Sequence, residues 1–195
     1  MNETNRTDRF APLFAELDRR LAGDAPVRLA IEGGSASGKT TLGKILTERY
    51  GCTVFHMDDF FLRPEQRTAA RFAEPGGNVD RERFLEEVLL PLHRGRKILY
   101  RRFDCASMQL QNAVETALKK LVVAEGAYSM HPEIAPYYDL SVFLDISPEL
   151  QRERISHRNT PEKAKRFFTE WIPMEQAYFA AFDIPARCTL RIPIK

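Results

Sequence analysis

The stretch GGSASGKT, residues 33–40, decides how this chain folds. It fits the phosphate-binding pattern G-x-x-x-x-G-K-[ST] at every fixed position. An apolar run at residues 27–31 predicts a buried strand before it, and residues 41–46 predict the opening of a helix after it. Glycines let the main chain turn its N–H groups inward, and the helix adds its positive end, so this arrangement attracts a phosphate. The stretch, called the phosphate loop below, therefore predicts nucleotide binding.

The phosphate loop also indicates which groups hold the nucleotide and its metal. The Lys39 ammonium is placed to reach the β- and γ-phosphates, and the Thr40 hydroxyl is placed to bind Mg²⁺. The residues expected to bind the nucleotide are Gly33, Gly34, Ser35, Ala36, Ser37, Gly38, Lys39, Thr40 and Thr41. We expect ATP and Mg²⁺ as cofactors, and the sequence leaves the choice between ATP and GTP open. A GTPase switch is disfavoured because the chain has no Asn-Lys-x-Asp segment to read guanine.

Composition indicates one globular domain over residues 1–195. Hydrophobic residues make up 44% of the chain and charged residues 29%, which excludes a disordered protein. The formal net charge is only +2, so charge gives no case for a nucleic-acid partner. We expect a small-molecule partner instead, and the sequence leaves a homo-oligomer open.

Three features favour a cytoplasmic protein without a membrane partner. No apolar run approaches the ~20 residues that a membrane span needs. Residues 1–8 are polar and lack the apolar core of a signal peptide. Cys52, Cys105 and Cys188 are far apart and odd in number, which is typical of reduced thiols rather than disulfides.

The apolar runs predict a three-layer α/β/α fold with a mostly parallel sheet of about five strands. Runs at residues 27–31, 53–57, 121–124 and 140–145 are separated by helical patterns, which is typical of a parallel sheet covered on both faces. Residues 189–194 could add an edge strand. An amphipathic helix is expected within residues 1–23, where Leu13, Leu17 and Leu21 repeat at helical spacing.

Other segments lie outside this regular pattern. Residues 60–79 show no clear period, and a connection of that length is usually functional or mobile. Residues 98–104 predict a strand, whereas residues 106–120 fit either a helix or a hairpin arm. We assign 60–79 and 96–120 to the acceptor side, and 148–182 to a lid and the C-terminal helices.

Acidic residues follow the predicted strands, at the edge where an open α/β sheet binds its ligands. They are Asp58, Asp59, Glu125 and Asp145. Each could be a helix cap or a solvated strand end, but beside the phosphate loop they suggest a phosphoryl-transfer site. Such a site needs a group that accepts the proton of the attacking hydroxyl. Arg152, Arg154 and Arg158 form either a solvated basic face or a clamp on the transferring phosphoryl group.

Five motifs together resemble the uridine kinase branch of the P-loop kinases, a group that includes phosphoribulokinase and bacterial pantothenate kinase. They occur in the family's order from residue 27 to residue 158. They are the phosphate loop, Met57-Asp58-Asp59-Phe60-Phe61, Phe103-Asp104, Val123-Ala124-Glu125-Gly126 and the segment from Arg154 to Arg158.

The resemblance assigns roles to these residues. It implies that Asp58 is the catalytic base, with Asp59 as the alternative, and that Glu125 lies near the metal with Thr40. Lys39, Arg154 and Arg158 complete the implied catalytic group. The residues implied to bind the acceptor are Asp58, Arg101, Phe103, Asp104 and Met108.

Two positions depart from the family's pattern on the acceptor side. Met108 stands where uridine kinases have a histidine that contacts the pyrimidine, and a thioether donates no hydrogen bond. Phe103 stands where they have a tyrosine. Arg101 and Arg102 leave an anionic acceptor open.

We therefore expect an ATP- and Mg²⁺-dependent kinase that phosphorylates a hydroxyl of a small molecule, with a nucleoside such as uridine as the leading acceptor. Alternatives are a kinase of pantothenate or of a sugar phosphate, and a non-catalytic nucleotide-binding regulatory protein.

Overall fold

The computed structural model describes residues 8–195. Residues 1–7, which belong to the range 1–23 in which we expect a helix, lie outside the described part. The described chain begins with a short 3-10 turn, η1 (Asp8–Phe10), followed by helix α2 (Ala11–Leu21).

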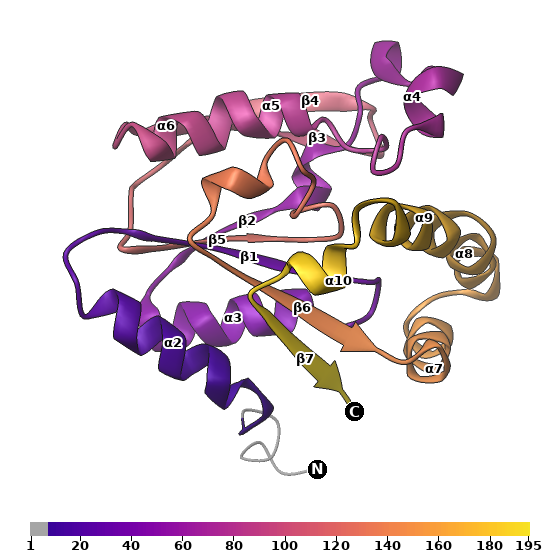
Figure 1. Ribbon diagram of the computed structural model, residues 1–195. Coiled ribbons are helices and arrows are strands. Elements are labelled where there is room, and N and C mark those ends of the chain that lie inside the picture. Colours follow the sequence, from indigo (N-terminus) through magenta and orange to yellow (C-terminus); the bar gives the residue numbers. More distant parts are fainter. Residues whose placement is uncertain (1–7) are drawn as a thin grey trace.

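A five-stranded parallel sheet forms the centre of the molecule (Figure 1). Its strands are β1 (Val27–Gly33), β2 (Thr53–His56), β5 (Leu121–Glu125), β6 (Leu140–Ile146) and β7 (Leu190–Ile194). They lie in the order β2-β5-β1-β6-β7, and every neighbouring pair is parallel. In this register Leu29 of β1 lies opposite Val123 of β5 and Leu140 of β6. The expected sheet is confirmed, including its edge strand.

Successive residues of β1 point to opposite faces of the sheet, and helices cover both faces, so the fold has three layers. Leu29 and Ile31 pack with α2 and with α3 (Lys39–Tyr50), which lie below the sheet in Figure 1. Ala30 faces the other core, against the helical segment 81–93 and the C-terminal helices. Both cores are built from fully buried aliphatic and aromatic side chains, so the sheet is covered on both sides as its continuous apolar strands predict.

Two π-helical turns interrupt helical segments of this protein. One continuous segment contains α5 (Arg81–Phe84), the π turn η4 (Leu85–Leu89) and α6 (Leu90–His93). After β6 come α7 (Pro148–Arg158), α8 (Pro161–Arg166), the π turn η6 (Phe167–Trp171), α9 (Ile172–Phe182) and α10 (Ile184–Arg187). The Ser147 and Thr160 side chains cap α7 and α8, and each of these helices begins with a proline.

Short helical turns and a hairpin lie outside the central sheet, and the strand expected over residues 98–104 is confirmed as one arm of the hairpin. The turns are η2 (Met57–Phe60), η3 (Pro64–Gln66), α4 (Ala69–Ala73) and η5 (Ala135–Tyr137). Strands β3 (Ile98–Asp104) and β4 (Gln109–Thr116) form an antiparallel hairpin, so the ambiguous segment 106–120 contains a hairpin arm rather than a helix. Leu110, Val114 and Leu118 are spaced four residues apart, which favours a helix. In the structure Val114 instead pairs with Tyr100 across the hairpin.

None of the helices within residues 8–195 combines the length and the apolar character needed to cross a membrane.

Candidate active site

A deep cleft of about 1460 Å³ follows the carboxyl edge of the sheet. A cleft for one small ligand usually has roughly 300–1,000 Å³, so this one has room for two reactants. Its lining includes residues 35–41 of the phosphate loop and its helix, together with Asp58, Glu125, Arg154 and Arg158. The structure thus brings residues from four distant parts of the sequence to one cavity.

The phosphate loop depends on glycine where β1 approaches β6. Gly33 has φ +146°, and a Cβ on it would lie 2.7 Å from the carbonyl oxygen of Leu144. Any other residue would force the two strands apart at the point where the loop begins. Farther along the loop, Ala36 has φ +63°, a left-handed conformation that costs a non-glycine residue free energy and is typical of functional sites.

Lys39 and Ser37 both point polar groups into the loop. Lys39 Nζ donates to the carbonyl oxygens of Gly33 at 2.7 Å and Gly34 at 3.0 Å. Ser37 is 1% exposed, and its Oγ has no hydrogen-bond partner among the described residues. A buried hydroxyl without a partner costs free energy, and a phosphate oxygen would satisfy it. The loop therefore fits the nucleotide phosphates that its sequence predicts.

Side chains from α7 and α9 hold the outer side of the loop. Glu175 of α9 accepts hydrogen bonds from Ser35 N at 2.9 Å and from Ser35 Oγ at 2.6 Å. Gln151 of α7 donates to Ser35 O at 2.9 Å, and Arg154 Nη1 donates to Ala36 O at 3.1 Å. Burial raises the pKa of Glu175 above its ordinary value, although Lys39 acts in the opposite direction. Our sequence analysis missed Glu175 and Gln151, because no motif near either residue indicates a contact with Ser35, which lies more than 100 residues away in the sequence.

Asp58 lies in the η2 turn directly after β2, and its side chain opens into the cleft. The η2 turn lies close against Gly126, which follows β5. A Cβ on Gly126 would lie 2.5 Å from the Cβ of Met57, the residue before Asp58, so a larger residue at 126 would displace this turn. Asp58 stays in contact with solvent in the cleft, but partial desolvation by the surrounding protein raises its pKa above its ordinary value, and Lys39 acts to lower it. A carboxylate with a raised pKa is a better proton acceptor.

Asp59 points toward the hairpin. Its Oδ2 lies 3.5 Å from Nε of Arg102, and its main-chain carbonyl accepts a hydrogen bond from Arg83 at 2.9 Å. It does not line the cleft. Of the two adjacent acids, only Asp58 is therefore in position to meet a ligand.

Glu125, Thr40 and His56 form a hydrogen-bonded group beside the phosphate loop. Glu125 Oε1 accepts hydrogen bonds from Thr40 Oγ1 at 2.9 Å and from His56 Nδ1 at 2.5 Å. Burial acts to raise the pKa of Glu125, but the bond from His56 and the charge of Lys39 outweigh it and lower the pKa. The same bond raises the pKa of His56, so the two form a charge-assisted pair. The sequence analysis missed His56, although its place two residues before Asp58 was a signal.

The oxygen atoms of Thr40 and Glu125 fit the ligand chemistry of Mg²⁺. This ion prefers oxygen ligands and usually binds one or two protein groups, with phosphates and waters completing its shell. No cluster of three or more His, Cys, Asp or Glu side chains suited to a metal ion occurs in the described part of the chain. A Mg²⁺ ion here would therefore depend on the nucleotide phosphates and on waters for most of its ligands.

The part of the cleft beside Asp58, called the acceptor end below, is largely apolar and aromatic. Its lining includes Phe61, Arg67, Cys105, Met108 and Tyr128. The Arg67 guanidinium lies 5.7 Å from the centre of the Phe103 ring, and its Nε donates to Leu62 O at 3.0 Å. Arg67 was not among the expected site residues, whereas Met108 was and does line the cleft.

Three other residues expected at the acceptor do not line the cleft. The main-chain N–H of Arg101 donates to Glu87 at 3.0 Å, and its guanidinium turns to the same carboxylate on the outer face of β3. Phe103 is 5% exposed and packs beneath Arg67. Asp104 caps the hairpin turn by accepting from Ala106 N and Ser107 Oγ. All three side chains are held by contacts within or beside the hairpin and are therefore not directed into the cleft.

Of the remaining charged candidates, Arg158 lines the cleft, whereas Asp145 and Arg152 do not. Asp145 pairs with Arg191 of β7 at 2.8 Å and does not line the cleft. Arg158 lines the cleft and lies 5.5 Å from the centre of the Phe167 ring. Arg152 lies over the ring of Phe168 and does not line the cleft.

Known proteins with a similar sequence or a similar fold exist for most of this chain. The Phosphoribulokinase / Uridine kinase family matches residues 29–167. Uridine kinase from Clostridium perfringens is 23% identical over 150 residues, which cover 72% of this chain and 71% of that protein. Uridine kinase from Brevibacillus brevis is 25% identical, with coverage of 72% and 69%. The structure of a possible uridine kinase from Bacillus stearothermophilus aligns at a TM-score of 0.71 with 19% identity, covering 96% of this chain and 99% of that one.

Proposed function

The chain belongs to the Phosphoribulokinase / Uridine kinase family of P-loop kinases, and on that premise we propose a specific reaction for it. It transfers the γ-phosphoryl group of ATP to a hydroxyl of a small molecule, in the presence of Mg²⁺. The leading acceptor is a nucleoside such as uridine. The observation that supports this most strongly is that the phosphate loop, Asp58 and Glu125 line one cleft.

In this proposal the phosphates lie in the phosphate loop, held by main-chain N–H groups. Lys39 exchanges its present carbonyl partners, Gly33 and Gly34, for the β- and γ-phosphate oxygens. Ser37 Oγ gains the partner that it lacks. Thr40, with Glu125 nearby, would hold Mg²⁺, and the bound ion would supply positive charge that neutralises the phosphates.

Asp58 accepts the proton of the acceptor hydroxyl. The hydroxyl oxygen then forms a bond to the γ-phosphorus as the bond from that phosphorus to the β–γ bridging oxygen breaks, and ADP leaves. Arg154 and Arg158 lie on α7, where their guanidinium groups can stabilise the negative charge of the transferring group.

A second class of acceptor is favoured by one observation. Arg67 puts a guanidinium at the acceptor end of the cleft. A guanidinium binds carboxylates and phosphates, so a hydroxyl compound with an anionic group, such as pantothenate or a sugar phosphate, is the alternative acceptor.

The test is ADP release by the wild-type protein with ATP and Mg²⁺, measured with and without each of uridine, cytidine, pantothenate and sugar phosphates. A rise that depends on one acceptor supports the kinase. A flat response to every acceptor contradicts it and favours a regulatory nucleotide-binding protein. Arg67→Ala separates the two acceptor classes, because it should raise KM about tenfold for an anionic acceptor and little for a nucleoside.

A further inference from the structure

Glu175 of α9 lines the cleft beside the phosphate loop. It is 4% exposed, and its carboxylate accepts hydrogen bonds from both the main-chain N–H and the hydroxyl of Ser35. The loop packs closely on this side, because a Cβ on Gly34 would lie 3.5 Å from Glu175 Oε2 and 2.8 Å from Gln151 Nε2. A loop whose main chain suits anions thus already holds a protein carboxylate at one of its N–H groups.

The negative charge of Glu175 is balanced only through space by the nearby ammonium of Lys39. Lys39 acts to lower the pKa of Glu175, although burial raises that pKa by more. The hydrogen bonds of the ammonium go instead to the carbonyl oxygens of Gly33 and Gly34. In the proposed function Lys39 turns to the phosphates, which then share its attraction with Glu175. Because water screens a buried charge little, Glu175 acts strongly on a phosphate beside it.

The position of Glu175 relative to Asp58 indicates which phosphate it faces. Lys39 acts on the pKa of both carboxyl groups, and Asp58 raises the pKa of Glu175, so the three side chains lie within electrostatic reach of one another. All three line the cleft. The γ-phosphorus has to lie beside Asp58 if the acceptor hydroxyl is to reach it, whereas the other phosphates lie farther toward the start of α3. Glu175 therefore belongs to the γ-phosphate end of the loop.

We propose that Glu175 is a specificity-determining residue for the phosphate donor. Its negative charge opposes the terminal phosphate of a nucleoside triphosphate, and so reduces the preference of the phosphate loop for a triphosphate over a diphosphate. This inference rests on the proposed function, because it assumes that a triphosphate is the donor. Glu175 lies outside residues 29–167, the part of the chain that matches the family.

The charge of Glu175 acts differently on the two nucleotide complexes of the reaction. In the complex with the triphosphate it weakens binding of the ground state, where the terminal phosphate carries its full negative charge. Once the γ-phosphoryl group has moved to the acceptor, the nucleotide left in the loop has no terminal phosphate beside Glu175. The ADP complex therefore gains stability relative to the ATP complex.

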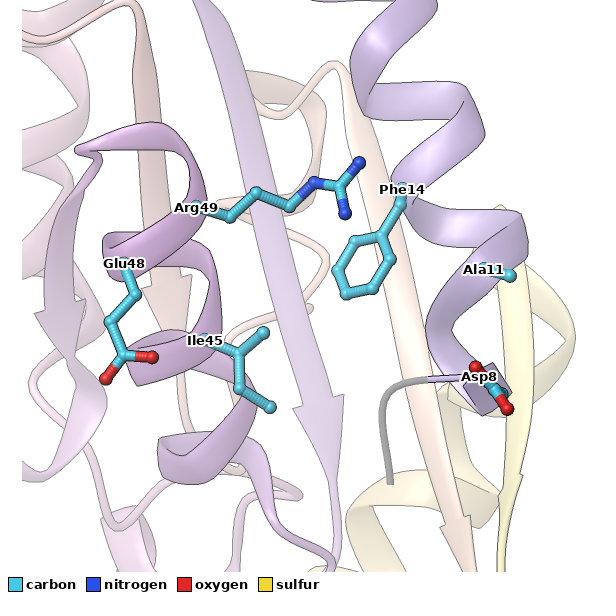
Figure 2. Close-up of a pocket in the computed structure, with 6 residues that line it drawn as sticks. All are labelled: Asp8, Ala11, Phe14, Ile45, Glu48 and Arg49. Atoms are coloured by element: carbon cyan, nitrogen blue, oxygen red, sulfur yellow. The ribbon is translucent and has the colours of Figure 1, made fainter. Parts of the chain in front are cut away.

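A second groove, between α2 and α3, supplies a matched control. It has about 460 Å³, and Glu48 of α3 is among the residues that line it. Figure 2 shows the Glu48 side chain extending from α3 away from Arg49 and Phe14. Glu48 is exposed and does not line the cleft. Glu48→Gln thus removes the same charge as Glu175→Gln, but from a solvated position.

The experiment compares two affinities within each protein. Calorimetry in Mg²⁺ buffer measures the dissociation constants of ADP and of the ATP analogue that has an imido group between its β- and γ-phosphates. Glu175→Gln keeps the shape of the side chain and an acceptor for Ser35, whereas Glu175→Met removes both the charge and the hydrogen bonds. Unfolded protein changes both constants by the same factor, so their ratio reports the site even in a less stable variant.

We expect Glu175→Gln to tighten binding of the ATP analogue relative to ADP about fivefold or more. Glu175→Met should shift the ratio in the same direction, because it removes the same charge. Glu48→Gln should leave the ratio within about twofold of the wild-type value, because its charge is exposed and screened.

Three results would overturn the inference while leaving the proposed function intact. One is an unchanged ratio in the Glu175 variants, and another is a shift in favour of ADP. The third is an equal change in both affinities, which would show that Glu175 acts only on the shape of the loop. If the wild-type protein binds neither ADP nor the analogue, the proposed function itself fails.

Discussion

His56 Nδ1 lies 2.5 Å from Oε1 of Glu125, and this contact joins two neighbouring strands of the sheet. The same carboxylate oxygen accepts the hydroxyl hydrogen of Thr40. Since Thr40 lies in the first turn of α3, directly behind the phosphate loop, the imidazole fixes the orientation of a carboxylate at the proposed Mg²⁺ position. Groups that orient metal ligands in this way commonly affect metal affinity and activity.

His56→Ala should therefore reduce turnover about tenfold or more and raise the Mg²⁺ concentration needed for half-maximal rate. His56→Asn should retain more activity, because its side-chain amide can still donate to Glu125. His93→Ala is the control, since His93 contacts Arg28 away from the cleft. The measurement is turnover across a Mg²⁺ titration, and an unchanged Mg²⁺ requirement in His56→Ala would refute the positioning role.

Lys39→Ala should weaken ADP binding about tenfold or more, because the ammonium is the side-chain cation at the centre of the phosphate loop. Lys44→Ala removes the same charge from an exposed position of the same helix, α3, and should bind ADP normally. Calorimetry with ADP and Mg²⁺ measures both. Equal affinities in the two variants would remove the case for phosphate binding by Lys39.

Glu32 should make the stability of the protein depend on pH. It is fully buried below the phosphate loop, and burial raises its pKa to about 7 despite hydrogen bonds from Gly33 N and Met130 N. Between its unfolded pKa of 4.5 and about pH 7, the folded protein keeps a proton that the unfolded chain has lost. The free energy of unfolding should therefore fall as pH rises through this window, by on the order of 3 kcal/mol, and level off above it.

The measurement is urea unfolding of wild type and Glu32→Gln at several pH values from about 4.5 to 8. Glutamine cannot titrate, so this variant should lose the Glu32 part of the slope, whatever its absolute stability. Identical slopes in the two proteins would show that Glu32 keeps an ordinary pKa.

The sequence was sufficient for features whose causes are local. The phosphate loop follows from a pattern of eight consecutive residues, and the strands of the sheet follow from short apolar runs. The sequence also put Asp58 and Asp59 at the end of β2, but it could not choose between them. That choice depends on Arg102 and Arg83, which come from a hairpin and a helix far along the chain.

The rest of the site depends on contacts that no local pattern encodes. Glu175 meets Ser35 only after 140 residues have folded around the sheet. Arg101 had the right charge near the right motif, but strand alternation and the irregular register of the hairpin turned it to Glu87. Residues that fill a cleft from the two ends of the described chain, such as Arg9 and Ile194, carry no motif at all.

Proton acceptance by Asp58 is the central claim, and acceptor-dependent ADP release by Asp58→Asn and Asp59→Asn tests it most directly. Both variants replace a carboxylate by an amide of the same shape, but only Asp58 lines the cleft. We expect Asp58→Asn to bind ADP normally while its turnover falls about 10²-fold or more, and Asp59→Asn to keep most of its turnover. Wild-type turnover in Asp58→Asn would contradict the account.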